Sequence, residues 1–103
     1  MISLDTNVVS ETLRKSPDPA VVAWLVRFDA ELALPTVTIA EMAFGIAKFQ
    51  PDQRATRLEQ GLAMSAPDAM IAAIARVNGG RLATRNLTDF RTTGLELTSP
   101  WEF

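Results

Sequence analysis

The sequence contains neither cysteine nor histidine among its 103 residues. Without cysteine, the chain has no disulfides and no thiolate metal sites, which fits a reducing compartment. Without histidine, it has no zinc–histidine site and no catalytic triad built on an imidazole. Carboxylates are therefore the groups left to act as acids, bases or metal ligands.

The sequence also lacks a long hydrophobic run and a secretory signal. No apolar stretch approaches the roughly 20 residues that a membrane-spanning helix needs. The carboxylate of Asp5 follows Met1 too closely to leave room for the apolar part of a signal peptide. We therefore expect a cytoplasmic protein with no membrane partner.

The composition is that of a folded protein, with 48% hydrophobic residues. A chain of this length is sufficient for one domain with one core, and we find no internal repeat or linker. We therefore expect a single domain over residues 1–103.

Excess charge of either sign is also lacking, because the net charge is only −2. Its distribution is uneven: residues 1–47 sum to −3, residues 48–91 to +3 and residues 92–103 to −2. The middle segment could supply phosphate contacts. For any single base, a solvated surface position explains the sequence at least as well. The bases concerned are Lys48, Arg54, Arg57, Arg76, Arg81, Arg85 and Arg91.

Turn and capping residues divide the chain into alternating strands and helices. The expected strands are residues 2–4, 31–37, 81–84 and 95–97. The expected helices are residues 8–13, 19–28, 38–49, 52–62 and 69–77, with a turn or helical start at 86–90. This alternation predicts an α/β fold with a parallel sheet.

Capping residues mark the starts of these helices. Thr6 or Asn7 can cap the first helix, and Asp18 the second. Thr38–Glu41 and Ser65–Asp68 each match a capping box, in which a hydroxyl and a carboxylate three residues apart satisfy the first turn.

Four acidic residues stand where a strand gives way to a helix or in the first turn of a helix. In a parallel sheet these places converge outside the carboxyl ends of the strands. Carboxylates gathered there repel each other: a pair about 5 Å apart costs on the order of 3 kcal/mol at an effective dielectric of about 20. A divalent cation would offset this repulsion, which points towards hydrolysis of a phosphodiester. The four residues are Asp5, Glu41, Asp68 and Asp89.

Each of these acids also has a purely structural explanation. Asp5 could form an Asx turn, and Asp89 could cap a short helix. Glu41 and Asp68 occupy the third position of their capping boxes, where a carboxylate stabilises a helix. Any one of the four alone is better explained in this way, but the set of four is better explained as a site.

Four segments in order, together with Pro100-Trp101, carry a resemblance to a known family. They closely resemble PIN-domain ribonuclease toxins of the VapC type, especially the FitB-like group, over almost the whole chain. The segments are Leu4-Asp5-Thr6-Asn7, residues 38–46 (TIAEMAFGI), residues 65–75 (SAPDAMIAAIA) and residues 82–90 (LATRNLTDF).

By this resemblance, three acids match the standard acidic positions of the family: Asp5, Glu41 and Asp68. The fourth position is assigned to Asp89, and Asn86 could share or replace its role. Asn7 and Thr84 match polar residues that line the same pocket.

The resemblance implies an endoribonuclease that depends on Mg²⁺ or Mn²⁺, the toxin of a type II toxin–antitoxin pair. Asp5 and Asp68 would bind the metal, while Glu41 and Asp89 would complete its shell or orient and deprotonate the attacking water. Oxygen ligands and the lack of histidine and cysteine favour such a hard cation over zinc. The implied partners are RNA, an antitoxin protein and a second copy of the chain.

The chain departs from the family in its middle. Members of the family usually carry a longer stretch, including an edge strand, between the helix after Glu41 and the segment that begins at Ser65. We therefore expect that this edge strand is missing and that apolar surface is exposed, which favours oligomerisation. The alternative function is that of a truncated, inactive homologue that binds an antitoxin and cuts nothing.

Two other magnesium-dependent α/β classes fit poorly. A phosphatase of this kind uses Asp-x-Asp, whereas this chain has Asp5-Thr6-Asn7. A receiver domain needs adjacent acids early and a lysine late in the chain, yet Lys48 is the last lysine here.

Overall fold

The computed structural model describes residues 1–44 and 65–103. The strands are β1 (Ile2–Leu4), β2 (Leu32–Ala33), β3 (Arg81–Ala83) and β4 (Glu96–Thr98). The α-helices are α1 (Thr6–Thr12), α2 (Pro19–Arg27), α3 (Thr36–Phe44), α5 (Ala66–Val77) and α6 (Leu87–Phe90). Three short 3₁₀ helices are η1 (Asp29–Glu31), η2 (Arg91–Thr93) and η3 (Pro100–Glu102).

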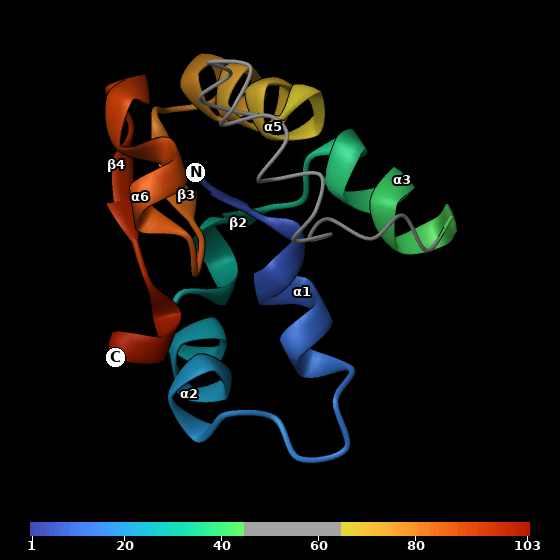
Figure 1. Ribbon diagram of the computed structural model, residues 1–103. Helices are drawn as coiled ribbons and strands as arrows, with labels where there is room; N and C mark the ends of the chain where they lie inside the picture. Colours follow the sequence, from blue (N-terminus) through green and yellow to red (C-terminus); the bar gives the residue numbers. More distant parts are fainter. Residues whose placement is uncertain (45–64) are drawn as a thin grey trace.

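The four strands form one parallel sheet in the order β2-β1-β3-β4. In the two pairings of β1, Ser3 lies opposite Ala33 of β2 on one side and Leu82 of β3 on the other. Figure 1 shows α5 and α2 on opposite sides of this sheet. The predicted fold class, an α/β protein with a parallel sheet of about four strands flanked by helices, is confirmed.

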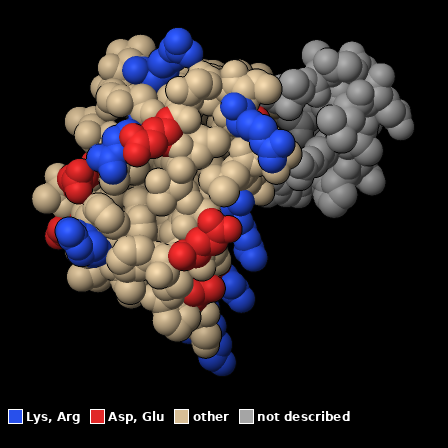
Figure 2. All heavy atoms as spheres, turned by 90° about the vertical axis from the view of Figure 1, so that its left-hand side faces the viewer, with Lys and Arg blue, Asp and Glu red and all other residues tan. Residues whose placement is uncertain are grey.

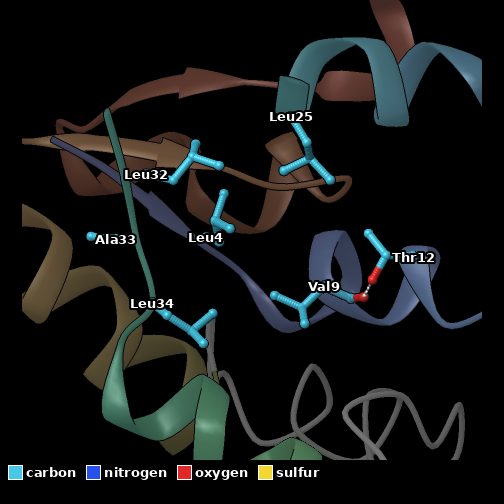
Figure 3. A pocket seen from close by; sticks show the side chains of 7 residues that line it. All are labelled: Leu4, Val9, Thr12, Leu25, Leu32, Ala33 and Leu34. Atoms are coloured by element: carbon cyan, nitrogen blue, oxygen red, sulfur yellow. Dashed lines mark hydrogen bonds between the residues drawn. The ribbon is translucent and has the colours of Figure 1, made fainter. Parts of the chain in front are cut away.

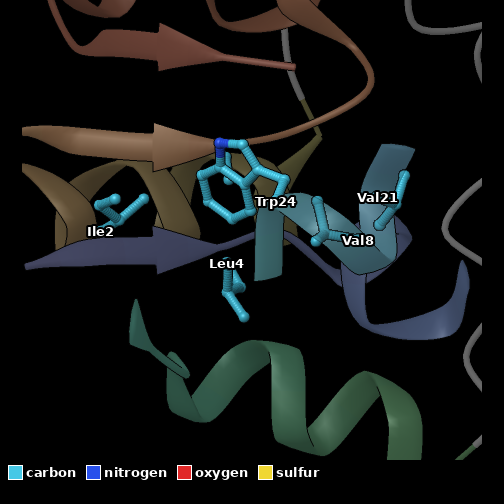
Figure 4. Packing of buried hydrophobic residues seen from close by; sticks show 6 residues of the cluster. Ile2, Leu4, Val8, Val21 and Trp24 are labelled. Carbon is cyan, nitrogen blue, oxygen red and sulfur yellow. The ribbon is translucent and has the colours of Figure 1, made fainter. Parts of the chain in front are cut away.

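One face of the sheet packs against α1 and α2. Ile2 and Leu4 of β1 point to this side, where they meet Val8, Val21 and Trp24 from the two helices (Figure 4). Val8 and Val21 are fully buried. Burial of residues two apart in β1 follows from the period of two in a strand, which turns alternate side chains to the same face.

The opposite face packs against α5 and α6. Leu82 of β3 is fully buried there with Ile71 and Ala75 of α5 and Phe90 of α6. Its neighbour in the same strand, Ala83, belongs to the first face instead. The sheet is therefore covered on both sides, as parallel sheets generally are.

The second strand is shorter than the sequence predicts. Leu32–Ala33 alone form β2, because residues 29–31 make a 3₁₀ helix and α3 already begins at Thr36. Proline at position 35 has no N–H for a strand ladder, and its carbonyl instead accepts the N–H of Ile39 at 3.1 Å. The prediction of a strand over residues 31–37 was therefore wrong in its second half.

The capping box predicted at Thr38–Glu41 was also wrong. Both residues lie inside α3, and the hydroxyl of Thr38 donates to the carbonyl of Leu4 at 3.0 Å. Thr38 thus ties α3 to the end of β1. Glu41 consequently lies in the second turn of its helix and not in the first.

The remaining helix starts follow the sequence more closely. Asp18 caps α2, and Ser65 caps α5 by accepting the N–H of Asp68 at 3.2 Å. The first helix is capped by Asp5, one residue before the predicted Thr6 or Asn7. The last strand is shifted by one residue from the predicted 95–97. The predicted helix over 52–62 lies outside the described residues.

Strand β2 forms one edge of the sheet, and among the described residues no strand pairs with its outer side. An apolar hollow of about 290 Å³ opens between β2, α1 and α2 (Figure 3). Its walls include Leu4, Val9, Leu25 and Leu32. An exposed apolar surface at the sheet edge is what the shortened middle of the chain predicts. Across the described part of the chain, we find no helix with the length and hydrophobicity of a membrane span.

Packing of α5 against the sheet provides a test of this fold. Ile71 is fully buried, whereas Met70 beside it in the same helix is 55% exposed. We expect Ile71→Ala to lower the free energy of unfolding by about 3 kcal/mol, through lost burial and a residual cavity. Met70→Ala is the matched control and should change it by less than about 0.5 kcal/mol. Urea denaturation measures both; equal losses in the two variants would contradict this orientation of α5.

Candidate active site

The centre of the site is Asp5, which directly follows β1 at the carboxyl edge of the sheet. Its backbone N–H continues the ladder with β3 by donating to the carbonyl of Ala83 at 2.9 Å. The residue is fully buried. Its carboxylate therefore comes from the middle of the sheet, where the neighbouring strand also ends.

Three donors hold the Asp5 carboxylate. The hydroxyl of Thr84, which follows β3, donates to Oδ2 at 2.7 Å, and the Asn7 amide donates to the same oxygen at 3.3 Å. The backbone N–H of Thr6 donates to Oδ1 at 2.8 Å. The positive end of α1 thus faces this carboxylate, which offsets part of its charge.

Glu41 reaches the same region from α3. It is 3% exposed, and its Oε1 accepts a hydrogen bond from the Thr6 hydroxyl at 2.7 Å. Within the described residues, its second oxygen, Oε2, is buried without a hydrogen-bond partner. Thr6 therefore links two acids that lie 36 positions apart in the sequence: its N–H binds Asp5 and its hydroxyl binds Glu41.

Burial raises the pKa of the Glu41 carboxyl above its ordinary value. The hydrogen bond from Thr6 opposes this shift, and the negative charge of Asp68 adds to it. A buried carboxyl beside another acid is harder to ionise, because neither water nor a cation compensates its charge.

Asp68 lies in the first turn of α5 and is 4% exposed. Its charge is near enough to Glu41 to raise the pKa of that carboxyl. The structure therefore brings together three buried acids from three separate segments. Thr6 joins Asp5 to Glu41 by hydrogen bonds, and the charge of Asp68 acts on Glu41.

The three acids do not form a ready-made cage for a cation. Within residues 1–44 and 65–103, no group of three or more acidic side chains is placed to hold one ion. Magnesium, however, is usually bound in proteins by one or two carboxylates, several waters and the phosphates of a substrate. The geometry therefore suits an open site and not a closed structural one.

The polar residues expected around the pocket form one connected group with Asp5. Besides binding Asp5, Thr84 accepts the backbone N–H of Asn86 at 3.1 Å, and Asn7 accepts that of Arg85 at 3.2 Å. The segment after β3 is thereby fastened to the start of α1. Asp89 follows in α6, where its backbone N–H donates to the carbonyl of Asn86 at 3.1 Å. Whether Asp89 or Asn86 completes the acidic set stays a prediction.

Sequence reasoning missed the role of Thr6, which it took only as a capping residue. Its position directly after Asp5 was the available signal, since a residue at a helix start can bond through both its backbone and its side chain. The partner, Glu41, could not be identified without the tertiary structure.

The basic residues visible at the β4 edge of the sheet do not form one patch. Figure 2 shows lysine and arginine interspersed with acidic residues on the face at the β4 edge of the sheet. Arg81 lies 3.1 Å from Glu31 and 3.7 Å from Glu96, and Arg76 donates to the carbonyl of Thr93. Arg81 and Arg76 therefore make contacts within the fold. Arg85 directly follows Thr84, which binds Asp5.

The fold and the site define an α/β protein with a parallel sheet and buried acids at its carboxyl edge. The sequence model of the PIN domain matches residues 2–64. The chain belongs to the PIN-domain family, in the group that contains the VapC and FitB toxins.

Similar proteins are found over the full length of the chain. It is 33% identical to the plasmid stability protein StbB of Pseudomonas syringae pv. tomato and 33% identical to the VapC ribonuclease Y4jK of Sinorhizobium fredii. Both comparisons cover 99% of each chain. It is 30% identical to the toxin FitB of Neisseria gonorrhoeae, over 98% of this chain and 99% of that protein.

Two solved structures resemble this one. The crystal structure of FitAcB from Neisseria gonorrhoeae has a TM-score of 0.77 at 28% identity and covers 100% of both chains. The structure of FitAB bound to an IR36 DNA fragment has a TM-score of 0.77 at 29% identity and covers 100% of this chain and 97% of that one.

The relatives match this chain at both ends but contain additional residues in between. The alignment with StbB spans 141 positions, although this chain has only 103 residues. The relative therefore contains residues with no counterpart here, in agreement with a chain shortened internally.

The burial of Glu41 predicts a pH dependence of stability. Because the pKa of Glu41 is raised in the folded state, the stability that the protonated carboxyl contributes is present below its unfolded pKa of about 4.3 and is lost as the pH rises through the folded pKa. We therefore expect Glu41→Gln, measured in EDTA, to unfold at a higher temperature than the wild type at about pH 8, with the difference vanishing near pH 4.

The exposed acid Glu96 supplies the control for this comparison. Its side chain is 73% exposed, so Glu96→Gln should show no such pH-dependent gain. A Glu41→Gln variant that is less stable than the wild type at both pH values would contradict the raised pKa.

Proposed function

We propose that this chain, as one domain over residues 1–103, is the ribonuclease toxin of a type II toxin–antitoxin pair and cleaves cytoplasmic RNA with Mg²⁺ or Mn²⁺. The observation that carries this proposal is the joining of Asp5 to Glu41 through Thr6, with Asp68 beside them. Burying several carboxylates together is costly for folding alone. A catalytic site is where such an arrangement is expected.

The residues present fit a divalent cation. The acidic side chains of the site offer oxygen ligands, and the buried Oε2 of Glu41 has no hydrogen-bond partner among the described residues. Asp5 and Asp68 would hold the ion. When bound, the ion would neutralise charge on the scissile phosphate and lower the pKa of a bound water.

The side chains around the ion have separate tasks in this proposal. Thr84 and Asn7 keep Asp5 in one orientation, and Thr6 does the same for Glu41. With its raised pKa, Glu41 is suited to take a proton from the attacking water at Oε2, because a base works best with a pKa near the working pH. The fourth position is assigned to Asp89 or Asn86.

The proposal includes two protein partners. The solved relatives are FitA–FitB complexes, and the curated relatives include a toxin and a plasmid stability protein, which supports an antitoxin partner. A basic side chain of that antitoxin would suit the negative charge of the site. Exposed apolar side chains support a homodimer as well. They include Leu13, Leu34, Ile39, Met70 and Val77.

Cleavage of RNA is the direct test. With Mg²⁺ or Mn²⁺, we expect the wild-type protein to cut structured RNA and Asp5→Asn to lose about a hundredfold or more in rate, because a metal ligand is removed. Gel analysis of labelled RNA measures the rate, and EDTA should abolish it.

A matched control separates catalysis from folding. Asp29 is an exposed acid in η1, so Asp29→Asn should cleave at the wild-type rate. Circular dichroism should show the same fold for all three proteins. Equal cleavage by the wild type and Asp5→Asn would reject the assignment of Asp5.

The second candidate function is that of an inactive homologue that only binds an antitoxin. The residues that the relatives have and this chain lacks favour this candidate. It predicts antitoxin binding without cleavage and without a response to metal.

Metal binding distinguishes the two candidates. For an active site that binds the ion only when folded, Mg²⁺ at about 100 times its dissociation constant should stabilise the protein by about 2.7 kcal/mol. We expect a rise in melting temperature on titration with Mg²⁺ or Mn²⁺, and a smaller rise for Asp68→Asn. A flat titration of the wild type, together with antitoxin binding, would favour the inactive homologue.

A further inference from the structure

A second hollow lies at the carboxyl edge of the sheet, one strand beyond the acidic site. It has a volume of about 390 Å³ and lies between α2, β4 and η3. Thr98, at the end of β4, lines it, and the carbonyl of the same residue accepts the backbone N–H of Thr84 at 2.9 Å. Thr84 in turn binds Asp5. Strand β4 lies two strands from β1, which Asp5 follows, and neighbouring strands are roughly 5 Å apart. At about 10 Å, the hollow is within reach of a nucleotide next to a phosphate held at Asp5.

The walls of this hollow combine aromatic rings with polar groups. Trp24 and Phe28 lie with ring centroids 5.2 Å apart, and Phe103 meets Phe28 edge-on at 6.1 Å. Phe103 is 61% exposed, so its ring is open to a ligand. Ser99 and the acidic residue Glu102 also line the hollow. By contrast, the walls of the hollow beside β2 are almost wholly apolar.

One arginine lies beside Phe28, which lines the hollow, and another lies beside Trp101, which does not. The guanidinium of Arg27 lies 5.2 Å from the centroid of Phe28, and that of Arg85 lies 5.1 Å from the centroid of Trp101. Trp101 directly precedes Glu102 in η3. Arg85 belongs to the segment between Thr84 at the acidic site and Leu87, which lines the hollow. Arg85 therefore brings positive charge into the segment that connects the acidic site to the hollow.

We infer that this hollow binds the base of a single-stranded nucleotide adjacent to the scissile phosphate. The base stacks on the exposed ring of Phe103, Arg85 holds the phosphate that precedes or follows it, and Glu102 accepts hydrogen bonds from its edge. Single-stranded RNA is recognised in proteins by this combination of stacking, base-edge hydrogen bonds and phosphate contacts.

The carboxylate gives the hollow a preference among bases. A carboxylate only accepts hydrogen bonds, so it pairs with the exocyclic amines of adenine, cytosine and guanine, whereas uracil offers only its ring N3–H. We therefore expect faster cleavage where the base in the hollow carries an amine. This inference rests on the proposed ribonuclease activity and adds to it a determinant of sequence preference.

Cleavage of short single-stranded RNAs that differ at one base beside the cut tests the preference, with the full chain and Mg²⁺ or Mn²⁺. Glu102→Gln introduces an amide that donates as well as accepts, so the preference for an amine-bearing base over uracil should fall about tenfold. Phe103→Ala should lower kcat/KM about tenfold for every base, through lost stacking. Glu96→Gln and Val26→Ala, both at exposed positions that do not line the hollow, are the matched controls and should change neither quantity.

A binding measurement separates this inference from the proposed activity. In EDTA, tryptophan fluorescence titrated with short oligo(A), oligo(C) and oligo(U) should report about tenfold weaker binding by Phe103→Ala than by Val26→Ala. This result would support the hollow even if no variant cleaved RNA, in which case the proposed activity alone would fail.

Two results would overturn the inference. The first is that the wild type cleaves RNA, while Glu102→Gln and Phe103→Ala both keep the base preference and the RNA affinity of the wild type. The other is a loss of antitoxin affinity in Phe103→Ala while its RNA affinity stays that of the wild type, since this would make the hollow a protein-binding surface.

Discussion

The central position of β1 in the parallel sheet is the constraint on which the rest of the structure depends. Its pairing with β2 on one side and β3 on the other brings the residues that follow two of these strands, Asp5 and Thr84, within hydrogen-bond distance. The same strand receives α3, because the Leu4 carbonyl accepts the hydroxyl of Thr38. A short strand of three residues thus determines where the helices that bear the acids must start or pass.

The fold accommodates the two carboxylates at this edge, Asp5 and Glu41, in different ways. Asp5 is satisfied by three donors within the fold, and the positive end of α1 reduces the cost of its charge. Glu41 receives one hydrogen bond and is left with a raised pKa, since burial and the charge of Asp68 oppose its ionisation. The two carboxylates therefore differ in character, as the proposed roles of metal ligand and base require. Thr6 binds both carboxylates, Asp5 through its backbone N–H and Glu41 through its hydroxyl.

The described sheet has an unpaired edge at β2, whereas Asp5 follows the interior strand β1. Compared with its relatives, the chain lacks internal residues, and β2 is unpaired on its outer side among the described strands. The apolar hollow beside β2 and the aromatic hollow beside β4 lie at opposite ends of the sheet. Assembly through the β2 side would therefore leave the β4 side open to a nucleic acid. The acids lie between the two hollows.

The sequence by itself determined the alternation of strands and helices, the parallel sheet and the family. The signals for these features each extend over a few residues: the alternation of side chains along a strand, the helix caps at Asp18 and Ser65, and the short motifs of the family. It also singled out Asp5, Glu41, Asp68 and Asp89. Only the tertiary structure decided that α3 begins at Thr36 and that Thr6 joins Asp5 to Glu41. The hydrogen bonds from Thr6 to Glu41 and from Thr38 to Leu4 connect residues more than 30 positions apart. A local sequence pattern carries no information on which distant group will satisfy a buried hydroxyl or carboxylate.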